Sequence, residues 1–590
     1  MTSNSPSPVP SAHSLHVAAL TLEAAAFVVL LLGIVYLFVT NSASAHWLQG
    51  YNPAGFWQLS TLLAALPIVV LLGAMAILRL KAHMAAIAGL VTALIAAIAV
   101  FHTPARLALT AAAYGAGYGL FPICWIILPV IFLYDLTVQT GRFLTLQQTL
   151  AGVTADSRLQ LLLIAFALSA FFEGACGFAT PVAVCSAILV SLGFRPLQAA
   201  GLVLVANTVP VAFGGMGIPI VALHGVTGLD LFALSRVSAM VLLPFDLLVP
   251  FWLVWAYAGL AATLEIWPAI LAAGVTFALA QILMAFWSGP WLVAIVSAAV
   301  TLVVLVVLLR FWQPRRTLNV NREEIGGGTH QAQSHTAATI FKGWLPWIVV
   351  SLVVFAWGLP RFSAWMNVHT TVKVPVAGLD NVILRMPPAV AAPTAEQAVF
   401  NLNWLSATGT GILIAALVAG MLMGLGPAAL LQAFIRTVYK IRYTLVTIAA
   451  MVALGYVTRY CGLDATLGLA LARTGSFYPF FGTLIGWLGT ASTGSDTASN
   501  VLFGSLQQMT AHQIGVAPVL MASANACGGV MGKMIAAPSV VVASTAAQIY
   551  GREGSILRFV FFHSLALAAL AGICVTLLAY APLLAGLVAH

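Results

Sequence analysis

The chain has 590 residues, of which 62% are apolar and only 6% carry a formal charge. Because about a quarter of the residues in a soluble domain are charged, this composition excludes a water-facing globular surface and predicts a membrane protein. The net charge of +9 arises from 23 Lys and Arg residues. These are scattered singly or in small loop clusters, which argues against a nucleic-acid-binding protein.

The apolar stretches are continuous, as at 58–78, 82–101 and 290–309, so the spans are predicted to be helices rather than barrel strands. A span needs about 20 apolar residues, and the chain length therefore accommodates about 12 to 14 transmembrane helices. We expect an all-α polytopic membrane protein. Gly115, Gly117 and Gly119 lie within one apolar run and predict close helix packing rather than a dinucleotide site.

Residues 1–45 are predicted to contain an extra N-terminal transmembrane helix. Its apolar run, 17–40, is followed by Ala43-Ser44-Ala45, which is typical of a signal-peptide cleavage site. Residues 1–14 contain no Lys or Arg, and the run is longer than the apolar core of a signal peptide. A retained helix is therefore favoured over a cleaved one.

The remainder divides into two halves. Residues 46–311 and 344–590 each contain interrupted apolar runs and are predicted to be two transport repeats. Between them, the basic and Gly-rich segment 312–343 is predicted to be a flexible linker. The positive-inside rule places this linker in the cytoplasm and leaves the mixed-charge segment 361–401 outside.

The interrupted runs match between the halves. Asn525 follows Asn207 by 318 residues, and Asp496 follows Glu173 by 323 residues, which indicates an internal duplication. In each half an acidic residue among Gly, Ser and Thr precedes an Ala-Asn pair and further Gly or Pro. Such segments predict helices that break at membrane depth and free backbone groups to face a binding site near the midplane.

Glu173 and Asp496 are the two carboxylates set most deeply in apolar sequence, and such groups are usually functional. We expect them to carry protons during transport; capping a broken helix is the alternative role. Lys533 is predicted to neutralise one of them or to bind a substrate carboxylate, unless it snorkels to the membrane surface. Arg459 is a second candidate anion partner, or else the end of a helix.

The other predicted substrate-binding residues surround the breaks, where backbone N–H groups and neutral side chains suit an anion. They are Gly174, Gly177, Thr180, Asn207, Thr208, Gly214, Thr493, Gly494, Ser495, Thr497, Ser499, Asn500, Asn525, Gly528 and Gly529. A separate set of charged residues near apolar edges is interpreted as helix ends or loops: Asp135, Arg195, Asp230, Asp246, Glu265 and Asp464.

No metal site or cofactor is expected, because the six cysteines have no CxxC spacing. An enzyme or an ATP-driven pump is disfavoured, since the sequence offers neither a catalytic nucleophile constellation nor a phosphate-binding Gly-rich loop.

Four blocks resemble the bacterial L-lactate permease family: the runs beginning Glu173-Gly-Ala-Cys-Gly and Ala206-Asn-Thr-Val-Pro, residues 486–500, and residues 528–535. The similarity runs from about Tyr51 to about residue 575. It implies proton-coupled uptake of L-lactate and related 2-hydroxy monocarboxylates (D-lactate, glycolate) across the bacterial inner membrane. It also implies kinship with transporters built from two inverted repeats with re-entrant hairpins.

The partners implied are a small monocarboxylate anion, a proton and the lipid bilayer, with oligomeric state left open. A sodium-coupled transporter of another organic anion is the alternative. The chain departs from the family pattern at Arg459 (commonly Asn), at Ala179 (often Gly) and at Ala536-Ala537-Pro538-Ser539 (usually Ser-Pro-Gln-Ser). If these positions line the site, the resemblance implies the class of substrate more strongly than the exact acid.

Overall fold

The computed structural model describes residues 46–145, 153–320, 337–549 and 552–581, apart from 77, 79, 176, 178, 179, 359 and 391. The helix expected within residues 1–45 lies outside this part. Nine helices among the described residues are long and apolar enough to cross a membrane, or up to eleven if each of two bent pairs counts as one span. The all-α polytopic prediction is confirmed. Shorter apolar helices account for further runs, because the chain breaks where Gly and Pro interrupt the sequence.

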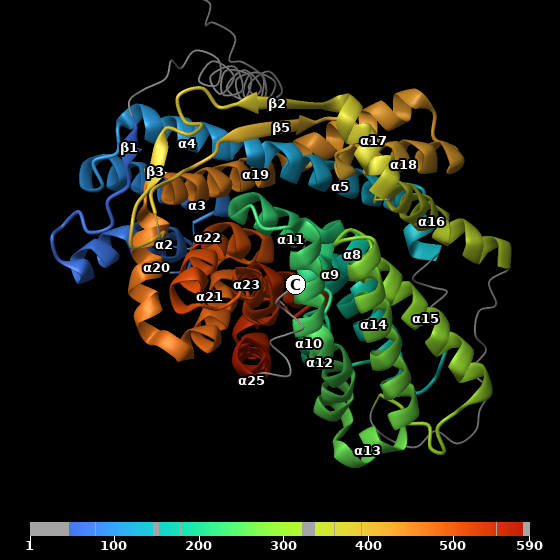
Figure 1. Ribbon diagram of the computed structural model, residues 1–590. Helices are drawn as coiled ribbons and strands as arrows, with labels where there is room; N and C mark the ends of the chain where they lie inside the picture. Colours follow the sequence, from blue (N-terminus) through green and yellow to red (C-terminus); the bar gives the residue numbers. More distant parts are fainter. Residues whose placement is uncertain are drawn as a thin grey trace, which may run out of the picture.

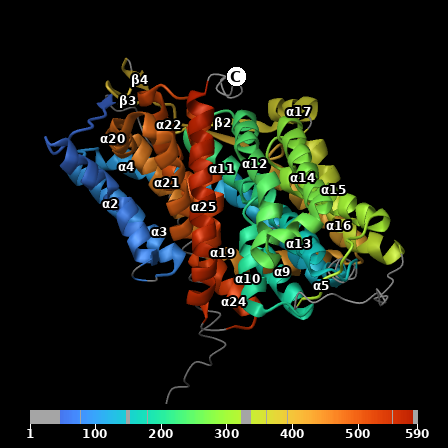
Figure 2. The ribbon, with the colours of Figure 1, turned by 90° about the horizontal axis from the view of Figure 1, so that it is seen from below.

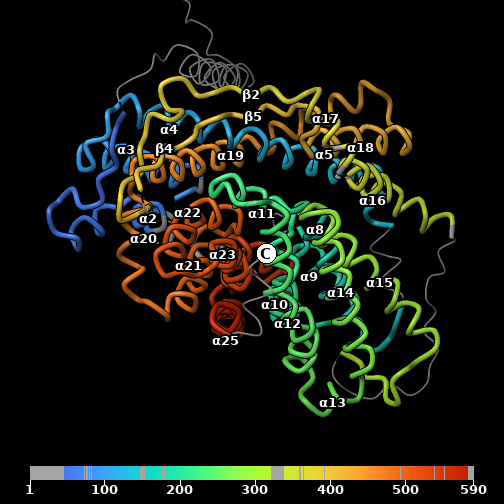
Figure 3. The backbone as a smooth tube through the Cα atoms, viewed as in Figure 1, coloured from blue at the N-terminus to red at the C-terminus, as the bar shows by residue number. Residues whose placement is uncertain are grey.

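One layer of helices runs along one side of the molecule (Figures 1 and 3). It is built around α19 and is called the scaffold here. Its helices are α2 (Trp57–Ala76), α3 (Ala82–Ile95) continued by η1 (Ala96–Val100), α4 (Ala105–Tyr118), η2 (Gly119–Cys124), α5 (Trp125–Gln139), α16 (Ala337–Gly358), α18 (Thr408–Leu422) and α19 (Pro427–Tyr460). A Cβ on Gly115 would lie 2.7 Å from Ala453 Cα, and one on Gly119 would lie 3.0 Å from Ala449 Cα. These two glycines therefore let α4 and η2 pack closely on α19, as predicted.

Two further groups of helices pack against the scaffold and against each other (Figure 3). The first group holds α7 (Ser157–Gln160), η3 (Leu161–Leu168), α8 (Ser169–Ala175), α9 (Thr180–Ser191), α10 (Pro196–Ala206), η4 (Val211–Phe213), α11 (Gly214–Thr227), α12 (Leu231–Ala258), α13 (Leu260–Glu265), α14 (Trp267–Trp287) and α15 (Val293–Phe311). The second holds α20 (Leu463–Leu471), η5 (Ala472–Phe477), α21 (Tyr478–Thr493), α22 (Asp496–Ile514), α23 (Pro518–Gly532), η6 (Lys533–Ile535), α24 (Ala537–Ala546) and α25 (Glu553–Tyr580).

The predicted helix breaks are confirmed. The chain bends by 68° between 196–206 and 211–227, and by 43° between 518–535 and 538–546. Each group also contains a helical hairpin: the first hairpin comprises α7, η3, α8 and α9, and the second comprises α21 and α22. Both hairpins turn at Gly-rich positions, where the chain changes direction without a bulky side chain.

One end of the molecule carries α17 (Pro360–Thr370) and short strands, and is called the strand end (Figure 2). Its strands are β1 (Trp47–Leu48), β2 (Thr371–Pro375), β3 (Ile383–Arg385), β4 (Thr394–Ala395) and β5 (Val399–Asn403). β3 pairs in parallel with β1 and antiparallel with β4, and β2 pairs antiparallel with β5 in the register Thr371 to Asn403. The open end of the second hairpin lies here, because Gln513 Nε2 donates to Pro388 O over 2.9 Å.

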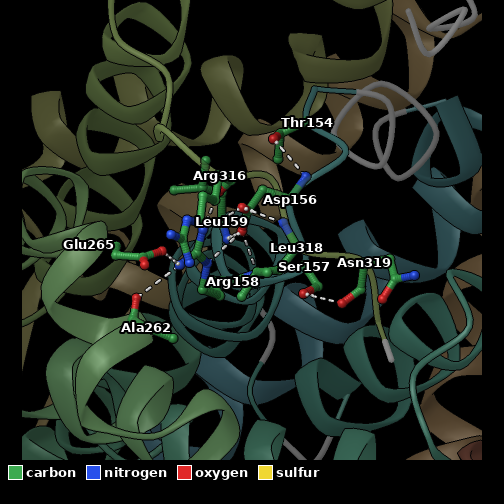
Figure 4. A network of polar contacts seen from close by, with 10 residues as sticks. All are labelled: Thr154, Asp156, Ser157, Arg158, Leu159, Ala262, Glu265, Arg316, Leu318 and Asn319. Atoms are coloured by element: carbon green, nitrogen blue, oxygen red, sulfur yellow. Dashed lines mark hydrogen bonds and ion pairs between the residues drawn. The ribbon is translucent and has the colours of Figure 1, made fainter. Parts of the chain in front are cut away.

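The opposite end, called the linker end, is held by a buried arginine (Figure 4). Arg158 is completely buried, pairs with Asp156 at 2.8 Å and Glu265 at 2.9 Å, and donates to Arg316 O at 2.7 Å. Ser157 at the start of the first hairpin donates to Asn319 O at 3.0 Å. The first hairpin therefore opens toward the linker end. Within the predicted linker 312–343, Arg316 and Asn319 thus make backbone contacts with the first hairpin, and α16 begins at Ala337.

Candidate functional site

A cavity of about 310 Å³ lies where the tips of both hairpins and the breaks of both bent pairs meet α19. Of the residues predicted from the sequence, nine border it: Glu173, Gly177, Gly214, Thr493, Gly494, Ser495, Asp496, Thr497 and Lys533. Residues separated by up to 360 positions thus share one site. The volume is at the small end of ligand pockets and suits a small solute.

The tip of the second hairpin directs a helix start at this cavity. Gly494 takes a left-handed conformation, with φ of 76°, and so ends α21. The Ser495 side chain then accepts from Ala498 N at 3.3 Å and caps α22. The first turn of α22 borders the cavity, so its partial positive charge favours an anion there.

Glu173 lies at the end of α8 and is only 3% exposed. Its Oε2 accepts from Asn207 Nδ2 at 2.9 Å, and Asn207 Oδ1 in turn accepts from Ser169 Oγ at 2.8 Å. A Cβ on Gly214 would lie 2.7 Å from Glu173 Oε1. A side chain at position 214 would therefore displace the carboxylate from its present position.

Asp496, also 3% exposed, lies at the start of α22 and completes the second half of the site. Its Oδ1 accepts from Thr490 Oγ1 at 3.3 Å, and its Oδ2 lies 3.5 Å from Asn500 Nδ2. Asn500 Oδ1 accepts from Asn525 Nδ2 at 2.9 Å. The predicted asparagines thus hold the carboxylates in place, without bordering the cavity themselves. Gly529 packs directly against Asp496.

Lys533 is the cation of the site. Its Nζ donates to Gly494 O at 3.0 Å, at the tip of the second hairpin. It borders the same cavity as Glu173 and Asp496. Among the described residues, Gly494 O is the hydrogen-bond acceptor for the Lys533 ammonium group. An ammonium group has three N–H donors, so further donors remain for a ligand. This position fits an anion-binding lysine better than one that snorkels to the membrane surface.

The remaining predicted residues lie near the breaks but do not border the cavity. They support the backbone: Gly174 packs on Ala294, Thr180 begins α9, Thr208 donates to Val205 O, Ser499 donates to Gly486 O, and Gly528 packs on Thr483.

Arg459 lies away from the cavity, at the strand end of α19. It donates to Val226 O at 2.5 Å and to Glu396 Oε2 at 3.3 Å, and Arg385 pairs with the other oxygen of Glu396. Burial acts to raise the pKa of Glu396, but the guanidinium groups of Arg459 and Arg385 together hold it below its usual value. Arg459 is thus engaged with a carboxylate of the protein.

Asp246 was predicted to lie at a helix end or in a loop, and this is wrong. It lies within α12, is completely buried, and accepts from Gln281 Nε2 at 2.5 Å. Pro244 and Pro250 flank it inside the same helix. Transmembrane helices tolerate such prolines because neighbouring groups satisfy the freed carbonyls, so the local sequence resembles a helix end without being one.

Sequence reasoning missed one wall of the cavity. Thr444, Thr447, Ile448, Met451 and Val452 border it, in a part of α19 that has no helix break and no charged residue to indicate a site. Pro538 and Ser539 at the start of α24 also border it, and they belong to the segment that departs from the family pattern. Among the described residues, no group of three or more His, Cys, Asp or Glu side chains is placed to hold a metal ion.

A cavity enclosed by broken helices within a polytopic bundle, lined by a lysine and two buried carboxyls, is typical of a membrane transport protein rather than an enzyme. The family model described as L-lactate permease matches residues 60–582. The chain belongs to the L-lactate permease family.

Curated relatives agree with this assignment. The L-lactate permease of Salmonella typhimurium LT2 is 41% identical over 90% of this chain and 98% of its own length. The L-lactate permease of Bacillus subtilis 168 is 41% identical over 88% of this chain and 96% of its own. The glycolate permease GlcA of Escherichia coli K12 is 40% identical over 90% and 98%. The chain is a multi-pass membrane permease, as expected for the bacterial inner membrane.

Proposed function

We propose that the chain takes up L-lactate and related 2-hydroxy monocarboxylates, D-lactate and glycolate among them, together with protons. The observation that carries this proposal is the position of Lys533, whose ammonium group contacts the hairpin tip in a small cavity that two buried carboxyl groups also border. The names of the relatives, lactate and glycolate permeases, support the same class of substrate.

The substrate carboxylate would bind Lys533 and the N-terminal turn of α22. A monocarboxylate matches one lysine, since burying a second negative charge without a partner is costly. The apolar wall of Ile448, Met451 and Val452 on α19 would contact the hydrocarbon part of the substrate.

Proton coupling would follow from the shared cation. A bound carboxylate competes with Glu173 and Asp496 for Lys533 and adds a negative charge beside them. Substrate binding and protonation of a carboxyl group therefore favour each other, which is the thermodynamic definition of coupling. Glu173 is the preferred proton carrier, because its Oε1 faces Gly214 at the cavity.

Alternating access would use the two halves, 46–311 and 344–590, as inverted repeats. This proposal is supported by the hairpins, because the first opens toward the linker end and the second toward the strand end. Movement of the two groups of helices that contain the hairpins, relative to α19, would expose the cavity to each side of the membrane in turn.

Uptake of radiolabelled L-lactate into proteoliposomes under an imposed pH gradient tests this function. Unlabelled D-lactate, glycolate, pyruvate and acetate serve as competitors. We expect accumulation in sodium-free buffer, with inhibition by D-lactate and glycolate, and collapse when a protonophore is added. Strict dependence on sodium, or transport of a different anion only, would reject the proposal.

A further inference from the structure

Ser539 combines two properties that no other hydroxyl-bearing residue shares among the described residues that border the cavity. It is only 1% exposed, and its Oγ is buried without a hydrogen-bond partner in the described part of the structure. A buried hydroxyl without a partner is costly and calls for an explanation. Because Ser539 borders the cavity, a hydrogen-bonding group of a bound substrate would supply the partner that its Oγ lacks.

The other hydroxyl groups of the cavity are already engaged or are more accessible to solvent. Thr447 donates to Tyr443 O at 2.7 Å, Thr493 donates to Gly489 O at 2.7 Å, and Ser495 caps α22. Thr444 and Thr497 are only partly buried, so water can satisfy them. Among the described residues that border the cavity, Ser539 therefore carries the buried hydroxyl that has no hydrogen-bond partner.

Ser539 borders the same cavity as Lys533, the proposed carboxylate anchor. Ser539 lies in the first turn of α24, just after the break that carries Lys533. The N-cap of α24 is Ala536, whose side chain provides no cap hydrogen bond, so this ten-residue helix also directs an unblocked N-terminus at the site. A hydroxyl group beside the bound carboxylate would contact the substituent on carbon 2 of the substrate.

We infer that Ser539 hydrogen-bonds the 2-hydroxyl group of the substrate and so makes the site selective for 2-hydroxy acids over acids that lack this group. This inference rests on the proposed function, since it assumes that Lys533 holds the carboxylate. L-Lactate and propionate differ only in the 2-hydroxyl group, so the change in their relative affinity between wild type and a Ser539 variant reports on this contact.

The test measures the concentrations of unlabelled L-lactate and propionate that halve uptake of tracer L-lactate in proteoliposomes. The propionate concentration divided by the L-lactate concentration is expected to fall about 3- to 10-fold in Ser539→Ala, because a neutral hydrogen bond contributes a modest free energy. Ser539→Thr, which keeps a hydroxyl, is expected to retain more of the preference. Ser235→Ala is the matched control, since Ser235 is also buried with an unpartnered Oγ but lies on α12 and does not border the cavity.

An unchanged ratio in Ser539→Ala, or an equal fall in Ser235→Ala, overturns the inference. If Ser539→Ala takes up neither acid, Ser539→Cys replaces it, with a fall in the same ratio expected. Failure of the proposed function would look different, because the wild-type protein would then take up neither L-lactate nor glycolate.

Discussion

Replacing Lys533 by Gln removes the one cation that borders the cavity among the described residues while keeping a similar length and a hydrogen-bond donor. A hydrogen bond to a charged group contributes about 1.5 to 3 kcal/mol. At about 1.4 kcal/mol per tenfold change, the half-saturating concentration of L-lactate is expected to rise about 10- to 150-fold. The maximal rate should change less, provided that the protein reaches the membrane in normal amounts.

The assay is initial-rate uptake of labelled L-lactate into proteoliposomes over a range of concentrations. Lys440→Gln is the matched control. Lys440 pairs with Asp135 at 2.7 Å, but its side chain is 57% exposed and does not border the cavity, so its loss should leave the half-saturating concentration unchanged. The same value in Lys533→Gln and wild-type protein would refute the assignment of Lys533 as the carboxylate anchor.

Three further predictions concern buried polar groups. Glu173→Gln should abolish accumulation of L-lactate against its gradient but retain exchange of internal for external L-lactate. Asp246 is a buried carboxyl away from the cavity, so Asp246→Asn should accumulate L-lactate normally. Accumulation by Glu173→Gln would show that Glu173 does not couple transport to protons. Asn207→Ala and Asn525→Ala should both impair uptake, since each leaves a buried partner unsatisfied at a cost of about 1–3 kcal/mol; impairment of only one, with both well expressed, would argue against a single shared site. Because the pKa of Glu396 is lowered in the folded state, its carboxylate stabilises the protein above its unfolded pKa of about 4.3 and this stabilisation is lost as pH falls through the lower, folded value. The melting temperature of Glu396→Gln should therefore lie below that of wild type at pH 7, and the gap should narrow under acid conditions; a gap independent of pH would contradict this.

The helix breaks could be predicted from the sequence because their causes are local. Gly and Pro interrupt apolar runs around Gly214 and Gly494, and the backbone there bends as those residues allow. The meeting of Glu173, Asp496 and Lys533 at one cavity followed from the matched spacing of the two halves.

What the sequence could not show depends on partners far along the chain. Arg459 pairs with Glu396, 63 residues away, and no local pattern distinguishes that pairing from binding of a substrate anion. The α19 wall of the cavity, including Thr444 and Met451, has an uninterrupted helical sequence. The face of α19 that borders the cavity is determined by how the two groups of helices containing the hairpins pack against it, and this packing is not visible in the local sequence.

The central proposal, that protons move together with the monocarboxylate anion through this cavity, is tested most directly by measuring proton movement. Proteoliposomes with a trapped pH-sensitive dye receive external L-lactate in sodium-free buffer, and protein-free liposomes correct for diffusion of lactic acid. We predict internal acidification that requires the protein, is lost in Glu173→Gln and is retained in Asp246→Asn. Entry of labelled L-lactate without acidification, or only in the presence of sodium, would contradict the account.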